Sequence, residues 1–130
     1  MAEREIRTIM SRDMLIFQET TPMRDAIAKL VEGAQPLACV CGEEGGLLGV
    51  LTPKDCFTTA LNASYYQQWS GVVADHMTRT PRTLPADTDI IAAAETFQTD
   101  PFRAYPITDN GALVGVLSRH DLLRAFLDLG

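Results

Sequence analysis

The sequence predicts an α+β (α/β-type) fold made of two copies of one β-α-β-β-α unit, packed sheet to sheet about a pseudo-two-fold axis. Shifting the chain by 67 positions lays Met10 on Met77, and shifting it by 66 lays Gly49 on Gly115. One deletion in a glycine-rich turn explains the change of shift, so the identities indicate an internal repeat. A unit of about 60 residues buries only a modest core, so each copy is expected to need the other to cover its sheet.

Each copy is expected to begin with an extended segment, at 15–17 and at 82–84, and to continue with an amphipathic helix. Thr21 is expected to cap the first helix, with Pro22 at its first position, where a missing N–H costs no hydrogen bond. Thr88 is expected to open the second helix. Apolar residues at helical spacing define the expected buried faces, namely Met23, Ala26, Ile27, Leu30 and Val31, then Ile90, Ala93, Ala94 and Phe97.

Two strands joined by a tight turn, and then a closing helix, are expected to complete each copy. The pair Asn110-Gly111 favours a hairpin because both residues tolerate a positive φ. The strands are expected within 36–42 and 47–51, and within 104–108 and 113–117. The closing helices are expected to be amphipathic and to carry Phe57, Ala60 and Leu61, then Leu122, Leu123, Phe126 and Leu127. The expected organisation is a first repeat at 4–61, a linker at 62–71 and a second repeat at 72–129.

Composition limits the partners of the chain. The 130 residues carry a net charge of −6, so general attraction to nucleic acid or to an anionic membrane is not expected. The sequence has no apolar run of membrane-spanning length and no signal-peptide pattern at its N-terminus. Three cysteines are an odd number for a disulfide framework, which favours reduced thiols and a cytoplasmic location.

The stretches GVLTPKDCF (49–57) and GVLSRHDLL (115–123) repeat one motif, for which two interpretations remain open. In the structural interpretation, Thr52 with Asp55 and Ser118 with Asp121 are capping boxes that start two helices. In the functional interpretation, a helix N-terminus directly after a strand favours a phosphate, and the carboxylate can accept hydrogen bonds from a ribose diol. The motif alone does not choose between them.

The tandem units, the two GVL motifs and the stretch HMTRTPRTLPADT (76–88) together resemble a CBS-domain pair, also called a Bateman module, over roughly residues 4–129. The resemblance implies a regulatory module, not an enzyme, with no obligatory cofactor. It implies that AMP, ADP, ATP, S-adenosylmethionine or sometimes NAD binds in two clefts between the repeats. In this family the motif aspartate usually holds the ribose and the hydroxyl residue approaches the phosphates. It also implies a homodimer formed through the helices, and an unidentified regulated protein as a further partner.

The same resemblance assigns ligand-binding residues to each cleft. One cleft would combine Thr52, Lys54 and Asp55 with Thr80, Pro81, Arg82, Thr83, Arg103, Ala104 and Tyr105. The other would combine Ser118, Arg119, His120 and Asp121 with Asp13, Met14, Leu15, Pro36, Leu37 and Ala38. The first cleft is favoured for a nucleotide, because Pro36 replaces Arg103 in the second and Asp13 would repel phosphate there.

The alternative to ligand binding is a structural or protein-interaction module with empty clefts, which mediates dimerisation or docking. His120 could contact phosphate or simply be solvated, and His76 is expected to be structural. Cys39 and Cys41 are expected to be small core residues, because two thiols without further ligands do not make a zinc site. The linker aromatics are expected to cover the core, with adenine stacking or a dimer contact as alternatives; they are Tyr65, Tyr66 and Trp69.

Overall fold

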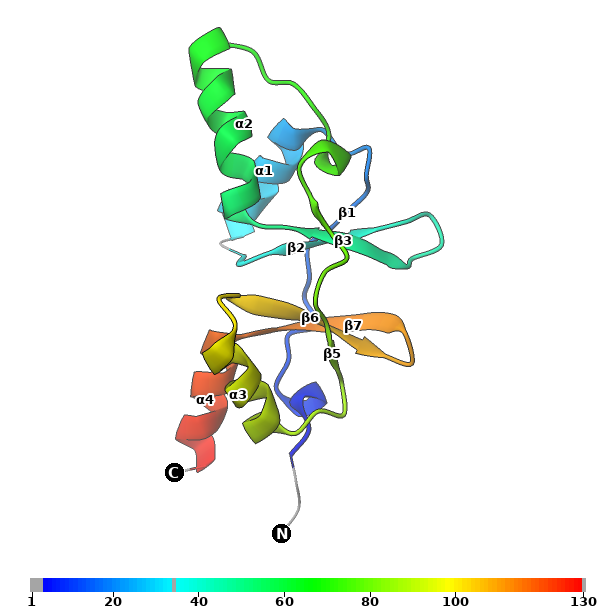
Figure 1. The fold of residues 1–130 in the computed structure, drawn as a ribbon, viewed down its shortest axis with the longest axis vertical. Helices are drawn as coiled ribbons and strands as arrows, with labels where there is room; N and C mark the ends of the chain where they lie inside the picture. The colour runs from blue at the N-terminus through cyan, green and yellow to red at the C-terminus, as the bar shows by residue number, and fades with distance from the viewer. Residues whose placement is uncertain (1–3, 34, 130) are drawn as a thin grey trace. The chain divides into compact units, whose positions relative to one another are not determined.

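The computed structural model describes residues 4–33 and 35–129 of the chain, which divides into two compact units (Figure 1). One unit is Leu15–Pro81, and the other combines the chain up to Met14 with the chain from Arg82 onward. The units therefore do not coincide with the sequence repeats. The segment that leads into each repeat packs with the sheet of the other repeat.

The unit Leu15–Pro81 contains a four-stranded sheet in the order β1-β2-β3-β4. The strands are β1 (Ile16–Phe17), β2 (Ala38–Cys41), β3 (Leu47–Leu51) and β4 (Thr78–Arg79). β1 pairs in parallel with β2, and the other neighbours are antiparallel. Helices α1 (Met23–Gly33) and α2 (Pro53–Tyr66) cover one face of this sheet, and the short 3-10 helix η2 (Val73–Asp75) follows α2 (Figure 1). The core lies between these helices and the sheet and includes Met23, Ala26, Leu30, Val40, Leu51, Cys56 and Val73.

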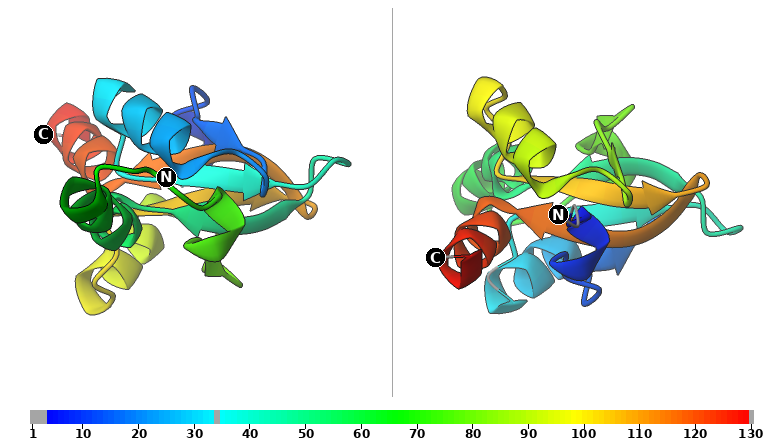
Figure 2. Two further views of the ribbon diagram at one scale, coloured as in Figure 1. Left: turned by 90° about the horizontal axis from the view of Figure 1, so that it is seen from above. Right: turned by 90° about the horizontal axis from the view of Figure 1, so that it is seen from below.

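The other unit contains a three-stranded sheet in the order β5-β6-β7. Its elements are η1 (Ile6–Thr8), β5 (Leu84–Pro85), α3 (Ile90–Thr99), β6 (Ala104–Asp109), β7 (Ala112–Ser118) and α4 (Arg119–Leu129). Both helices cover one face of the sheet, with η1 beside α3 (Figure 2). The core includes Ile6, Ile90, Ala93, Phe97, Tyr105, Ile107, Leu117 and Leu122. The mixed α+β fold of tandem β-α-β-β-α repeats is confirmed.

Each exchanged segment extends the sheet edge that it meets. Ser11 and Val116 exchange two backbone hydrogen bonds of 2.9 Å along the edge of β7. The counterpart pair, Thr78 with Val50, joins β4 to β3. A Cβ on Gly49 would lie only 2.5 Å from the Thr78 carbonyl oxygen, so the strands come this close only because position 49 has no side chain.

The starts of α1 and α3 differ from the prediction. Thr21 does not cap α1: its hydroxyl oxygen accepts from the Gln18 N–H, and Pro22 stands directly before the helix. Thr88 does not cap α3 either, because its hydroxyl donates to the Pro85 carbonyl. Asp89 is the cap of α3 and accepts from the N–H groups of Ile91 and Ala92. A threonine next to an aspartate offers two candidate caps, and here only the Asp89 carboxylate lies within hydrogen-bonding distance of the N–H groups in the first turn.

The closing helices are amphipathic as predicted, but several of their large apolar side chains are exposed. Phe57 and Leu61 on α2 are 71% and 47% exposed, and their counterparts Leu123 and Leu127 on α4 are 63% and 81% exposed. Leu122, Cys56 and Ala125 are buried, and Phe126 packs against the core. Helix α2 extends to Tyr66 and thus into the expected linker, where Tyr65 and Tyr66 are exposed and do not cover the core. No helix in the described ranges is long and apolar enough to cross a membrane.

Candidate functional site

The first GVL motif ends β3 and starts α2 with a complete capping box. The Asp55 N–H donates to the Thr52 hydroxyl oxygen at 3.3 Å. In return, the backbone N–H and the hydroxyl of Thr52 both donate to Asp55 Oδ2, each at 3.0 Å. Pro53 at the first helical position has no N–H to satisfy. The structural interpretation of this motif is therefore confirmed.

The second motif ends β7 and starts α4 in the same way. The Ser118 N–H donates to Asp121 Oδ2 at 2.9 Å, and the Asp121 N–H donates to the Ser118 hydroxyl oxygen at 3.1 Å. One difference separates the motifs. The Thr52 hydroxyl hydrogen is used on Asp55, whereas the Ser118 hydroxyl makes no donor bond within the part of the chain that the structure describes.

Capping leaves hydrogen-bonding groups free at both helix starts. Each box uses Oδ2 of its aspartate, and no described residue donates to Oδ1. The backbone N–H groups of Lys54 and His120 also have no acceptor among the described residues, as expected in the first turn of a helix. Each motif thus presents an acceptor, a backbone donor and the positive end of a helix dipole within one turn. The structural and functional interpretations are compatible.

A polar cluster forms beside β6, around a residue that the sequence analysis did not single out. Asp100, the residue after α3, accepts hydrogen bonds from the Tyr105 hydroxyl and, at 2.8 Å, from the Arg82 guanidinium. The Tyr105 ring packs edge-on against Phe97 and Phe102. Burial and then the bond to Asp100 raise the pKa of Tyr105 to about 12. Nothing in the local sequence distinguishes Asp100 from an ordinary exposed acid, because its partners come from separate segments.

Arg119 caps the C-terminal end of α3. Its guanidinium donates to the carbonyl oxygens of Phe97 at 2.6 Å, Asp100 at 3.0 Å and Phe102 at 3.3 Å. The guanidinium carbon also lies over the Phe97 ring, 5.6 Å from its centroid. A cation at a helix C-terminus stabilises the helix by satisfying carbonyls and opposing the dipole.

The family model of the CBS domain matches the sequence of this chain twice, at residues 6–61 and 73–128. The chain belongs to the CBS-domain family. CBSX2 from Arabidopsis thaliana is similar in structure, with a TM-score of 0.86 and 25% identity over 98% of this chain and 97% of that one. A CBSX2 complex with AMP gives a TM-score of 0.84 and 26% identity over 96% of this chain and 97% of that one. The chain is also 33% identical over 95 residues, 73% of its length, to the arabinose 5-phosphate isomerase KpsF of Escherichia coli, of which it spans 29%.

The remaining predicted site residues of the CBS repeats lie in both units. The unit Leu15–Pro81 contains the first motif together with Leu15, Pro36, Ala38 and Thr80. The other unit contains the second motif together with Arg82, Thr83, Arg103, Ala104 and Tyr105. Ala104 pairs with Ser118 across the β6–β7 ladder. Thr80 has a φ of 53°, in the left-handed region, which a β-branched residue rarely adopts. Such strain is often found at binding sites, but it does not by itself define one.

The cysteines of the first CBS repeat are buried. Burial raises the pKa of Cys39 to about 12 and that of Cys56 to about 11. Within the described ranges, no three histidine, cysteine or acidic side chains are grouped as a metal site would require. His76 contributes a hydrogen bond of 3.1 Å between its Nε2 and the hydroxyl of buried Thr59, which ties η2 to α2.

Proposed function

We propose that this chain is a regulatory module that binds an adenosine-containing ligand, with AMP as the first candidate and ADP, ATP and S-adenosylmethionine as the others. The observation that carries the proposal is that, among the described residues, neither Oδ1 of the two capping aspartates nor one backbone N–H at each helix start has a hydrogen-bond partner. CBS-pair proteins are generally regulatory modules, and we propose binding without a catalytic step.

Each motif has the groups that a nucleotide needs. A free carboxylate oxygen can accept from a ribose diol, and a helix N-terminus with an unused N–H can donate to a phosphate oxygen. At the first motif, which we favour, Thr52 and Asp55 would bind the nucleotide. At the second motif, Asp121 would hold the ribose and the Ser118 hydroxyl would donate its unused hydrogen to a phosphate oxygen.

The complex of CBSX2 with AMP supports AMP as the first candidate, because CBSX2 is 26% identical to this chain and matches its fold over nearly its whole length. A CBS-domain pair of MJ0100 in complex with S-adenosyl-L-methionine has the same fold with 18% identity. At that identity it supports the fold alone, so S-adenosylmethionine is the weaker candidate.

Isothermal titration calorimetry with AMP, ATP, S-adenosylmethionine and NAD tests the proposal. We expect saturable binding of AMP, and a ligand at 100 times its Kd should stabilise the fold by about 2.7 kcal/mol in a thermal melt. Asp55→Asn and Asp121→Asn each keep one carbonyl oxygen for the cap and replace the other acceptor by an amide donor. Each should weaken binding at its own cleft by roughly 10- to 100-fold, the value of a charge-assisted hydrogen bond.

Asp89→Asn is the matched control, because it makes the same change at a helix cap outside the motifs. It should bind AMP like the wild type. If no adenosine compound binds, or if the two motif variants bind as the control does, the ligand proposal is wrong and the alternative of an interaction module without a ligand gains support.

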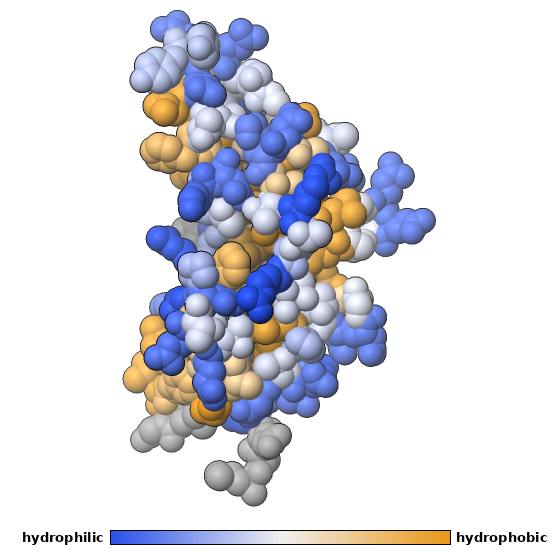
Figure 3. Space-filling model, viewed as in Figure 1, coloured by the Kyte–Doolittle hydropathy of each residue, from blue (hydrophilic) through white to orange (hydrophobic). Residues whose placement is uncertain are grey.

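We also propose that the chain forms a homodimer through the outward faces of α2 and α4. Figure 3 shows apolar side chains gathered along both helices on the face in view. Phe57 and Leu61 on α2 and their counterparts Leu123 and Leu127 on α4 form matching exposed stripes, and exposed apolar stripes are a common mark of an interface. Sedimentation equilibrium should report a dimer for the wild type and a monomer for Phe57→Ser combined with Leu123→Ser. A monomeric wild type would contradict this part of the proposal.

A further inference from the structure

The chain passes from one unit to the other after Pro81, the last residue of the unit Leu15–Pro81. Thr80, directly before this passage, has a φ of 53°. A left-handed backbone brings Cβ too close to the following carbonyl oxygen, and a β-branched side chain adds to the crowding. The proline that follows also favours an extended conformation at position 80. Thr80 is therefore strained, and such strain persists only where the surrounding structure holds the residue in place.

Two other described residues share this backbone conformation without the same strain. Gln67 and Asn110 also have a φ of 53°. Gln67 ends α2 in the left-handed conformation that is common directly after a helix. Asn110 lies in a hairpin turn, where asparagine tolerates a positive φ. Neither residue is β-branched and neither precedes a proline, so Thr80 needs an explanation of its own.

The backbone before Thr80 is anchored in its own unit. Strand β4 ends at Arg79, which pairs with Gly49 of β3. The Arg79 guanidinium donates to the Glu19 carboxylate at 3.3 Å and to the Ala74 carbonyl oxygen at 3.4 Å. The Thr80 hydroxyl donates to the Arg79 carbonyl oxygen at 2.6 Å. These bonds fix the position and the direction of the chain as it enters Thr80.

The backbone after Thr80 is anchored in the other unit. Arg82 donates from Nη1 to Asp100 Oδ2 at 2.8 Å. Asp100 is a fixed point, because its carboxylate also accepts from the Tyr105 hydroxyl and its carbonyl oxygen accepts from Arg119 at 3.0 Å. The Asp100 side chain is only 17% exposed, whereas the Arg82 side chain is 61% exposed and is free to swing away. We call the Arg82–Asp100 ion pair the latch.

The first passage between the units lacks both features among the described residues. The chain passes there between Met14 and Leu15. The repeat alignment matches Asp13 with Thr80 and Leu15 with Arg82. Asp13 is not one of the described residues with a positive φ, and Leu15 has no charge with which to form an ion pair. The strain and the latch thus occur together at one passage and are both missing at the other.

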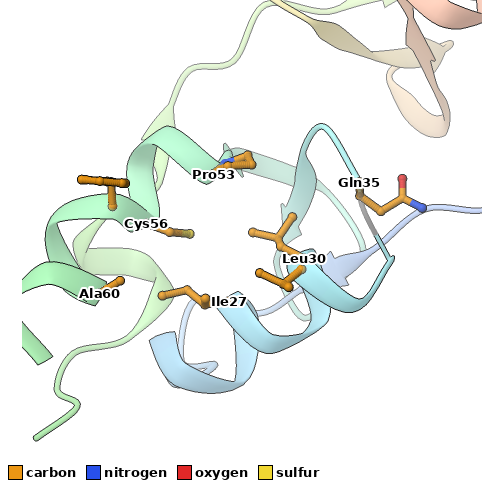
Figure 4. Close-up of a pocket in the computed structure, with 8 residues that line it drawn as sticks. Ile27, Leu30, Gln35, Pro53, Cys56 and Ala60 are labelled. Carbon is orange, nitrogen blue, oxygen red and sulfur yellow. The ribbon is translucent and has the colours of Figure 1, made fainter. Parts of the chain in front are cut away.

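The anchor of the latch is also specific to the second repeat. In the first repeat, Gly33 stands at the position of Asp100 and Pro53 at that of Arg119. Figure 4 shows Pro53 beside a hollow in the first repeat, whereas the Arg119 guanidinium holds the Asp100 carbonyl oxygen in the second. Because the first repeat forms the same β-α-β-β-α elements without these groups, the fold of a repeat does not require the latch.

We propose that the segment Arg79–Arg82 is a conformational switch that the latch holds closed. While Arg82 stays on Asp100, Thr80 keeps its left-handed backbone. When Arg82 leaves Asp100, Thr80 relaxes to an extended backbone and the chain leaves β4 in a different direction. A switch needs an element with two discrete states, and the strain at Thr80 favours the open one. The switch goes beyond the proposed function and uses neither GVL motif.

A double-mutant cycle between Thr80 and Asp100 tests the proposal, because it measures whether the strain at one residue depends on the other. Thr80→Gly should raise the melting temperature by roughly 3–6 °C, since glycine adopts a positive φ without strain. In Asp100→Ala the latch is open and Thr80 has already relaxed. Thr80→Gly should therefore give no rise in that background.

Gln67→Gly is the matched control, since it places glycine at the same φ outside the segment. It should change the melting temperature by the same amount in the wild type and in Asp100→Ala. An equal rise for Thr80→Gly in the two backgrounds would overturn the proposal, as would the absence of a rise in the wild type. If Asp100→Ala does not fold, Arg82→Ala opens the latch from the exposed side and the same cycle applies.

Trypsin cleavage of the native protein after Arg79 gives a second measurement, because cleavage requires the backbone around the bond to open locally. Asp100→Ala should speed this cleavage severalfold. Asp109→Ala opens another exposed ion pair, that with Arg7 in the same unit, and should leave the rate unchanged. Equal cleavage rates in the two variants would overturn the proposal. None of these experiments includes a nucleotide, so the switch and the proposed function fail independently.

Discussion

The glycine of each GVL motif gives the sharpest test of how the exchanged segments are held. In Gly49→Ala, the new Cβ would lie 2.5 Å from the Thr78 carbonyl oxygen and 3.3 Å from Met77 Sδ. A carbon and an oxygen ordinarily approach to about 3.3 Å, so β4 must move outward by nearly 1 Å. Its pairing with β3 covers only two residues, and the shift would break it.

The loss of stability in Gly49→Ala can be estimated as the sum of an overpacking term and a hydrogen-bond term. Overpacking costs about 1–3 kcal/mol, and each backbone hydrogen bond that is lost costs about 1 kcal/mol. We therefore expect Gly49→Ala to lower the free energy of unfolding by about 2–4 kcal/mol. Gly115→Ala should cost less, because its Cβ meets Ser11 O at 2.8 Å but otherwise only the flexible Met10 side chain.

Urea unfolding followed by circular dichroism measures these differences, with the m-value fixed across variants. Gly46→Ala is the matched control, since a Cβ there meets nothing within 4 Å, and it should stay within about 0.5 kcal/mol of the wild type. The expected order of stability is Gly46→Ala, then Gly115→Ala, then Gly49→Ala. If Gly49→Ala is as stable as the control, the close approach of β4 does not require this glycine and the reasoning fails.

Three further predictions follow from buried or capping groups. The pKa of Tyr105 is raised to about 12 in the folded state and is about 10 in the unfolded state, so its contribution to stability is full below pH 10 and is lost between pH 10 and 12. Tyr105→Phe should remove this loss of stability in melts measured across that pH range. A Tyr105→Phe profile that matches the wild type would contradict the prediction. Cys39 is fully buried, and burial raises its pKa to about 12. In a variant with Cys41→Ser and Cys56→Ser, it should react with Ellman's reagent at pH 8 only when the protein unfolds; fast reaction of the native protein would refute its burial. Arg119→Ala should lower the free energy of unfolding by about 1.5–3 kcal/mol in urea. Arg119→Lys should recover little of this stability, because an ammonium group lacks the planar fork of a guanidinium. A lysine variant as stable as the wild type would show that the charge alone matters.

The sequence was sufficient to predict the parts of the fold that depend on local patterns. The repeat, the hairpin at Asn110-Gly111 and both capping boxes needed only periodicity and short spacings. Thr88 was the wrong cap because two adjacent residues both suit that role, and the geometry that selects Asp89 lies in the backbone turn. Boundaries of this kind depend on one or two dihedral angles that composition does not reveal.

Features that depend on contacts between distant parts of the chain could not be predicted from the sequence. The exchange of leading segments between repeats arises because Ser11 and Thr78 pair with strands far away in the sequence. Asp100 gains its partners, Arg82 and Tyr105, only after α3 has packed. Helical spacing placed Phe57 on an apolar stripe, but spacing does not say whether the sheet or a partner covers that stripe.

The GVL motif illustrates how one short pattern serves several physical requirements at once. Its glycine admits an exchanged strand at van der Waals distance, and its apolar residues fill the sheet. Its hydroxyl and acid then start a helix with one carboxylate oxygen and one N–H left over. Many residues can cap a helix, and Asp89 caps α3 without the glycine or the hydroxyl residue of the GVL motif. The full pattern meets the requirements of a helix start and of a close strand in one short stretch, and the polar groups that it leaves over are those that our proposed ligand would use.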